Sequence, residues 1–298
     1  MTGSGHSERY DPPPAVHGVD TPGGGHIRLS HYGNGPLVLL LHGIGGHAGQ
    51  WAEVASAIGG CAHAVTWDAR GYGASTGRPI QAFSELADDL VAVIEALGGG
   101  PVLAVGHSMG GRILIEAACA RPDLFGALFL SGAQPAYLAH LTPAEREGYV
   151  ARRLAMFENG TVAPDRARGV AAEVLPPDAP EALIARLAAD FERLRPEGYG
   201  AALRASAGWD RRADLHRLGM PVVVMGGALD PVCPPQETRA LAKAVGAGEV
   251  HLLDGISHMA QLEAPQQVTT LIRGFVLSHG HRAARITGAQ TASGEVTT

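Results

Sequence analysis

The sequence predicts an α/β fold in which helices cover a mostly parallel sheet of eight strands. Short apolar runs alternate with amphipathic segments between about residues 16 and 280, which is typical of this class. The strand-like runs are apolar at consecutive positions, as expected for strands that are covered on both faces. A chain of 298 residues with 46% hydrophobic and 17% charged residues is also long enough to bury a large core.

The expected strands begin with an antiparallel hairpin. Its two arms are residues 16–19 and 27–31, because Pro22 and the three glycines that follow it force a turn between them. The buried strands that follow are expected at residues 37–41, 64–67, 102–105, 127–130, 222–225 and 250–253.

Helices are expected between these strands. In one of them, apolar side chains recur at helical spacing from Leu86 to Leu97, and three glycines at 98–100 end the helix. The five helices expected in this part of the chain lie at residues 50–58, 83–97, 109–120, 235–245 and 265–277.

Residues 134–208 interrupt the alternation, because no convincing strand occurs there. Thr142, Pro143 and Glu145 match an N-cap, a first-turn proline and a capping-box acid, so a helix is expected from there to Asn159-Gly160. Two further helices are expected over residues 183–194 and 200–207. The prolines at 164, 176, 177 and 180 predict a mobile connection inside the segment.

The chain therefore divides into four predicted parts. Residues 1–15 and 281–298 are polar and are expected to be a disordered N-terminal segment and a disordered tail. Residues 16–133 and 209–280 form the α/β core. Residues 134–208 form a helical cap, which should cover the carboxyl edge of the sheet.

Composition excludes several kinds of partner. The 23 basic and 29 acidic residues give a net charge of −6 without a basic stripe, so no nucleic acid is expected. The longest apolar stretches are far shorter than a membrane helix, and the first residues contain no apolar signal core, which predicts a cytoplasmic protein with no membrane partner. Cys61, Cys119 and Cys233 are scattered and odd in number, so neither a disulfide framework nor a zinc site is expected.

One glycine-rich turn is typical of a catalytic nucleophile. Gly106-His107-Ser108-Met109-Gly110-Gly111 follows an expected strand and opens an expected helix, as a nucleophile elbow does. Small residues are required two positions before and after the serine, because the strained turn leaves almost no room for side chains. Ser108 is the candidate nucleophile.

A serine hydroxyl needs a base, and the base needs an orienting acid. In this arrangement the chain order should be serine, acid, histidine. Asp230 follows the strand expected at 222–225, and His258 follows the next strand. The loop after the strand ending at Leu130 has no carboxylate, so Asp230 is favoured by elimination as well as by position.

The other histidines fit the base less well. His107 sits beside Ser108 on the elbow and is expected to point away from it. His42 precedes a glycine loop and is expected to brace that loop. His251 falls within an expected strand. That glycine loop, residues 41–46, could aim a backbone amide at a developing oxyanion. The candidate oxyanion donors are the N–H groups of Ile44 and Met109.

These motifs resemble the α/β-hydrolase superfamily from about residue 16 to 280. The matching pieces are His42-Gly43-Ile44-Gly45-Gly46, Asp68-Ala69-Arg70-Gly71-Tyr72-Gly73-Ala74-Ser75, the elbow Gly106–Gly111, Asp230 and His258.

Within the superfamily, the Asp-x-Arg-Gly-x-Gly-x-Ser stretch, the position of the cap and the segment Met220–Pro235 are similar to 3-oxoadipate enol-lactonases and their relatives. Those relatives include meta-cleavage product hydrolases, small carboxylesterases and cofactor-free haloperoxidases. Cys233 stands where such proteins often have threonine, so no catalytic role is assigned to it. Asp68 and Arg70 are expected to anchor their own turn.

The predicted function is a serine hydrolase that cleaves a small ester or lactone through an acyl-enzyme, with no metal or organic cofactor. Two alternatives stay open: a hydrolase of carbon–carbon bonds of the meta-cleavage type, and a ligand-binding protein on the same fold. The partner is a small-molecule substrate, and a homo-oligomer is possible.

The cap is expected to enclose a dry pocket for a substrate with a hydrophobic body. Five arginines of the cap are candidates to bind the carboxylate of a carboxylate-bearing lactone: Arg152, Arg153, Arg186, Arg193 and Arg204.

Overall fold

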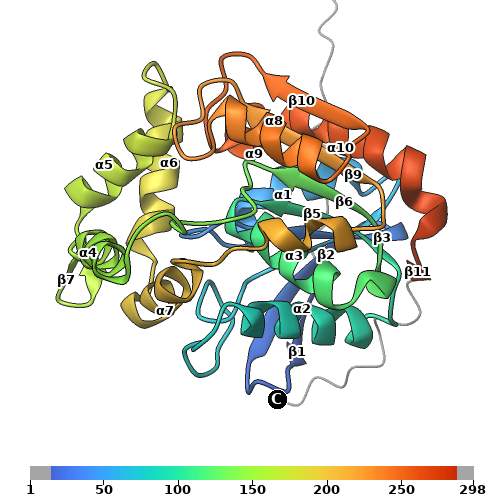
Figure 1. Cartoon of the computed structure of the whole chain (residues 1–298), viewed down its shortest axis with the longest axis horizontal. Coiled ribbons are helices and arrows are strands. Elements are labelled where there is room, and N and C mark those ends of the chain that lie inside the picture. The colour runs from blue at the N-terminus through green and yellow to red at the C-terminus, as the bar shows by residue number, and fades with distance from the viewer. Residues whose placement is uncertain (1–14, 287–298) are drawn as a thin grey trace, which may run out of the picture.

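The computed structural model describes residues 15–286, and eight of its strands form the main path of one large sheet (Figure 1). β1 pairs antiparallel with β2, and β2 pairs antiparallel with β4, whereas the remaining neighbours on the main path run parallel. The strand order is β1-β2-β4-β3-β5-β6-β9-β10. The strands are β1 (Ala15–Asp20), β2 (His26–Tyr32), β3 (Gly35–Leu41), β4 (His63–Trp67), β5 (Val102–His107), β6 (Phe125–Ser131), β9 (Val222–Gly227) and β10 (Glu249–Leu253). The predicted fold class and its eight strands are confirmed.

Both faces of the sheet are covered, which explains the continuous apolar runs. In β3, Leu37, Leu39 and Leu41 belong to one buried cluster, whereas Val38 and Leu40 belong to the other. The first cluster includes side chains of α2 (Ser84–Ala96), α3 (Met109–Ala120) and α8 (Pro235–Ala244). The second includes side chains of α1 (Ala52–Ile58) and α10 (Pro265–His279). Short helical segments complete the core: η1 (Ala48–Trp51), η2 (Pro122–Leu124), η3 (Arg212–Arg217), α9 (Ala260–Glu263) and η4 (Gly280–Arg282).

Four α-helices and a small hairpin lie between β6 and η3 in the chain. Figure 1 shows these helices gathered together at the left, to one side of the sheet. The first has the predicted cap: the Thr142 hydroxyl accepts from Glu145 N, and the Glu145 carboxylate accepts from Thr142 N. The elements are α4 (Pro143–Leu154), β7 (Phe157–Glu158), β8 (Thr161–Val162), α5 (Pro164–Val174), α6 (Glu181–Glu192) and α7 (Pro196–Ser206).

Two expectations for this segment are wrong. Asn159 and Gly160 do not end the first helix; they both have positive φ and form the turn between β7 and β8, where a strand was not expected. The second is wrong at Pro164 only: this proline supplies the fixed φ of a first helical residue and opens α5, whereas the prolines at 176, 177 and 180 lie in the link between α5 and α6.

The predicted disordered tail is wrong for residues 281–286. Arg285 and Ile286 form β11, which pairs antiparallel with the start of β3. Ala284 O accepts from Leu37 N, and Ala284 N donates to Pro101 O. The rest of the predicted tail and residues 1–14 lie outside the described residues.

Of the helices in residues 15–286, none combines the length and the apolar character needed to cross a membrane.

Candidate active site

Ser108 lies in the sharp turn between β5 and α3, with φ of 51° and ψ of −112°. Such a conformation is strained for a residue that carries a Cβ atom, and it is characteristic of functional turns. A Cβ atom at Gly106 would lie 2.6 Å from the backbone of Gly110, and one at Gly110 would lie 2.5 Å from Leu41 O. The strand, turn and helix of a nucleophile elbow are thus present, and the close packing explains both glycines.

Asp230 and His258 meet although 28 positions separate them. Asp230 follows β9 and His258 follows β10, and the Asp230 Oδ2 atom lies 2.8 Å from His258 Nδ1. The other oxygen, Oδ1, accepts from the backbone N–H groups of Val232 and Cys233, each at 2.8 Å. The fully buried carboxylate is therefore fixed in orientation, and it favours the histidine tautomer with the proton on Nδ1.

The loop that carries His258 is fastened by a residue that sequence reasoning missed. The Glu263 carboxylate accepts from Ser257 N at 2.7 Å and from Met259 N at 2.8 Å. Burial raises the pKa of Glu263, although these two bonds oppose the shift. His258 N also donates to the carbonyl oxygen of Val174, at the end of α5, so the helical insertion contacts the candidate base directly.

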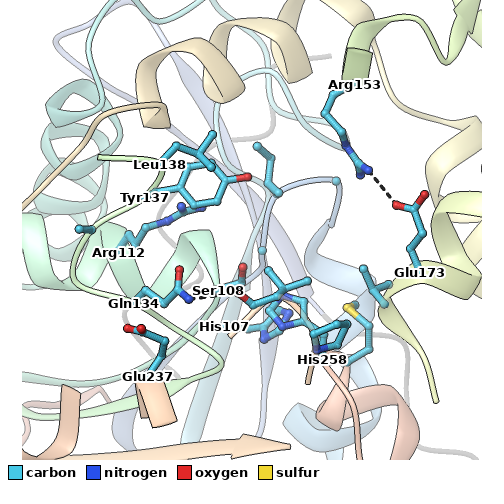
Figure 2. A pocket seen from close by; sticks show the side chains of 18 of the residues that line it. His107, Ser108, Arg112, Gln134, Tyr137, Leu138, Arg153, Glu173, Glu237 and His258 are labelled. Atoms are coloured by element: carbon cyan, nitrogen blue, oxygen red, sulfur yellow. Dashed lines mark hydrogen bonds and ion pairs between the residues drawn. The ribbon is translucent and has the colours of Figure 1, made fainter. Parts of the chain in front are cut away.

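His107 and His42 occupy different places around the site. His107 was expected to point away from Ser108; its ring packs against that of His258, with centroids 4.7 Å apart (Figure 2). His42 braces the glycine loop as expected. Its Nδ1 lies 2.8 Å from Gly43 O, and its Nε2 accepts from Ala69 N at 3.0 Å.

Two backbone amides are available near the elbow. Neither Ile44 N–H nor Met109 N–H has a hydrogen-bond partner among the described residues. Gly45 has a φ of +79°, and a Cβ atom there would lie 2.6 Å from the Phe191 ring, so this loop is closely packed under α6. That Ile44 and Met109 hold an oxyanion stays a prediction.

A pocket of about 620 Å³ joins the elbow to the helical insertion. Ser108, His258 and Ile44 line it from the core. Insertion residues that line it include Tyr149, Phe191 and Tyr199. Arg153 and Glu173 line it as well (Figure 2). Asp230 is not among the lining residues, because it is buried behind His258.

The charged groups of the pocket differ from those expected. Of the five arginines proposed for a carboxylate, only Arg153 lines the pocket, and it forms an ion pair with Glu173 at 3.0 Å (Figure 2). Arg112, which was not considered, also lines the pocket. Its position four residues after Ser108 on an expected helix was a usable signal, since residues four apart share a helix face.

The other singled-out side chains are structural. Asp68 accepts from Ala74 N in its own turn and from Ala48 N. Arg70 reaches beyond its turn and forms a buried pair with Asp89 on α2. Cys233 is buried, and burial raises the pKa of its thiol to about 12, which makes a thiolate nucleophile unfavourable there.

Comparison with known proteins places the chain in a family. The model of the alpha/beta hydrolase fold family matches residues 36–265. The chain belongs to the α/β hydrolase fold family. This hydrolase is 24% identical over 262 residues to 3-oxoadipate enol-lactonase 1 of Acinetobacter baylyi, covering 85% of this chain and 92% of the relative. It is 30% identical over 261 residues to a monoacylglycerol lipase of Mycolicibacterium smegmatis, covering 82% and 88%.

Solved structures agree on the fold. An esterase from Thermogutta terrifontis matches this hydrolase with a TM-score of 0.79 and 24% identity, covering 89% of this chain and 99% of that one. The predicted resemblance and the prediction of a hydrolytic enzyme are confirmed. These two relatives, the lactonase and the lipase, are named as enzymes, so they do not support the alternative of a non-catalytic ligand-binding protein.

Proposed function

We propose that this hydrolase cleaves a small ester or lactone through an acyl-enzyme, with Ser108 as nucleophile, His258 as base and Asp230 as orienting acid. The observation that carries the proposal is the 2.8 Å contact between Asp230 and His258 at a pocket that Ser108 also lines. Nucleophile, base and orienting acid in this chain order are the elements that acyl transfer by serine requires.

The chemistry proceeds in two halves. Ser108 Oγ attacks the carbonyl carbon while His258 Nε2 takes the hydroxyl proton, and Asp230 stabilises the imidazolium that forms. The oxyanion accepts from Ile44 N–H and Met109 N–H. Collapse of this intermediate breaks the ester bond, and His258 returns the proton to the leaving alkoxide.

Water completes the cycle by the same route. His258 removes a proton from a water molecule that attacks the acyl carbon, and the proton then passes to Ser108 Oγ as the acid is released. For a lactone, the alcohol and the acid leave as one molecule, so no separate leaving group departs between the two halves.

The size of the pocket and the names of the relatives support a small ester or lactone. A volume of about 620 Å³ lies within the range of pockets for small molecules. A long polymer would not fit entirely inside it. The relatives act, by name, as an enol-lactonase, a monoacylglycerol lipase and an esterase.

A substrate panel with Ser108→Ala as the blank tests the proposal. The panel contains p-nitrophenyl esters, lactones and ring-cleavage keto acids, and turnover of an ester or lactone that disappears in the variant is expected. Ser206→Ala is the matched control, because Ser206 is buried in α7 and its hydroxyl has no partner among the described residues. Turnover of the keto acids alone would favour carbon–carbon cleavage, and ester turnover that persists in Ser108→Ala would contradict the mechanism.

A further inference from the structure

Arg112 is a buried cation in the first turns of the helix that follows the candidate nucleophile. It lies in α3, one turn after Ser108, and both residues line the pocket. The residue is 3% exposed, yet it forms no ion pair with any described carboxylate, and its Nε atom has no hydrogen-bond partner in the described part of the chain. Buried arginines are normally paired, so this one lacks a counter-charge.

The partners that act most strongly on Arg112 are side chains that carry no charge near pH 7. Its guanidinium carbon lies 4.0 Å from the centre of the Tyr137 ring, a cation–π contact (Figure 2). The nearby titratable groups include Tyr149, Tyr72 and Cys233. Burial lowers the pKa of Arg112, but an arginine stays protonated in proteins. Arg112 therefore presents a positive charge to the pocket that contacts an aromatic face and forms no ion pair with a described carboxylate.

The other arginines of the pocket differ from Arg112 in this respect. Arg153 forms an ion pair with Glu173, and Arg212 forms one with Asp210. Glu237 also lines the pocket, but in the described part of the chain it forms no ion pair with Arg112. Among the described lining residues, the two other arginines are neutralised by the chain itself, and Arg112 is the one left to a ligand.

We propose that Arg112 binds a carboxylate of the substrate, so that the preferred substrates are carboxylate-bearing small esters or lactones. A carboxylate fits a guanidinium through two parallel N–H···O bonds and would supply the missing counter-charge. This inference rests on the proposed function and narrows its substrate class.

The helix sets the spacing between the two groups. The backbone of Arg112 lies about 6 Å along the helix axis from that of Ser108. Both side chains line one pocket, so the carboxylate would lie on the nucleophile's side of it. A short chain between the scissile carbonyl and the carboxylate suits this distance. The hemiester of a small dicarboxylic acid is the simplest substrate with that arrangement.

Matched substrate pairs measure the preference. The acyl-side pair is p-nitrophenyl hemiglutarate and p-nitrophenyl pentanoate, and the alcohol-side pair is 4-acetoxybenzoate and 4-acetoxybenzamide. Ser108→Ala provides the blank for spontaneous hydrolysis. We expect kcat/KM to favour the carboxylated member of at least one pair by about 10- to 100-fold, the range of a charge-assisted hydrogen bond.

The variants assign the preference to one side chain. Arg112→Met should remove this advantage, so that the ratio of kcat/KM for the carboxylated member to kcat/KM for the neutral member falls to about one. Arg112→Lys, which keeps the charge but not the fork, should retain part of it. Arg204→Met is the matched control, because Arg204 is exposed on α7 and is not among the residues that line this pocket. It should leave the preference unchanged.

Stability separates ligand binding from a structural role. Removing a buried charge that has no partner should leave the Tm of Arg112→Met unchanged or raise it. A lower Tm, with equal losses on both members of a pair, would overturn the proposal. No carboxylate preference in wild type, or one that survives in Arg112→Met, would overturn it as well.

A binding experiment distinguishes this inference from the proposed function. Glutarate should raise the Tm of Ser108→Ala but not that of the double variant Ser108→Ala/Arg112→Met. This result is independent of turnover, so an inactive enzyme would refute the proposed function while still testing Arg112. Equal shifts in both proteins, or none in either, would count against the carboxylate site.

Discussion

Replacing Asp230 by asparagine would keep the shape of the buried side chain and remove its charge. The side-chain oxygen could still accept from Val232 N and Cys233 N, the two bonds that fix the present carboxylate at 2.8 Å. The amide NH₂ would then face His258 Nδ1, where Oδ2 now lies at 2.8 Å. A donor at that place favours the tautomer with the proton on Nε2, which cannot accept the proton of Ser108.

The expected loss is large because two effects act together. The wrong tautomer removes the base, and the neutral amide cannot stabilise an imidazolium. Where the acid of a serine triad has been replaced in this way, kcat falls by about 10⁴, which corresponds to about 5.5 kcal/mol of transition-state free energy. The fold should persist, because asparagine preserves the volume and the two backbone hydrogen bonds.

Steady-state hydrolysis of a p-nitrophenyl ester measures this loss, and thermal unfolding checks the fold. Asp254→Asn is the matched control, since Asp254 is exposed on the loop between β10 and His258 and should leave kcat unchanged. A kcat for Asp230→Asn within tenfold of wild type, in folded protein, would refute the role assigned to Asp230 and would mean that another residue is the orienting acid.

Three further predictions concern stability and the thiol. Burial and two nearby histidines lower the pKa of His31 from 6.5 to about 3. As the pH falls, His31 is therefore protonated in the unfolded chain before it is protonated in the folded protein. His31 alone should therefore lower the free energy of unfolding as the pH drops below 6.5, by about 2 kcal/mol at about pH 5, and His31→Gln should reduce the pH dependence in denaturant titrations. Gly110→Ala should destabilise the protein by about 1–3 kcal/mol, because the new methyl would lie 2.5 Å from Leu41 O; an unchanged denaturation midpoint would contradict this close packing. Cys233→Thr should keep kcat within about threefold of wild type. Alkylation of native protein should leave Cys233 unmodified, because its buried thiol has a pKa of about 12. Loss of activity in the variant or on alkylation would give this thiol a role in the reaction.

The sequence was most informative where local chemistry and sheet geometry agree. The apolar run in β3 predicts burial on both faces, and the structure divides its side chains between two clusters. The glycines at 106 and 110 predict the elbow, because only a missing side chain permits that approach. Asp230 and His258 could be paired from chain order alone, since parallel strands end at one edge of the sheet.

Errors arose where one signal has two structural meanings. Asn159-Gly160 ends helices in many proteins, but its two positive φ angles here make a hairpin turn. Pro164 counts among the prolines that predict a mobile connection, although proline is also favoured at the first helical position, where it opens α5. The pairing of residues 285–286 with β3 depends on a contact distant in sequence, and nothing local predicts it.

The charges of the pocket could not be predicted for a related reason. Whether an arginine has a partner depends on which carboxylates the fold brings near it, and sequence spacing does not give that. Arg153 is a predicted carboxylate ligand, but its charge is paired with that of Glu173. Arg112 is not among the predicted ligands, yet it forms no ion pair with a described carboxylate.

Covalent labelling of the nucleophile is the most direct test of the account. A fluorophosphonate probe should add once per chain, peptide mapping should place it on Ser108, and activity should fall in parallel with the labelled fraction. Ser108→Ala should remain unlabelled and inactive. Labelling at another residue, or none in protein that still turns over an ester, would contradict Ser108 as the nucleophile.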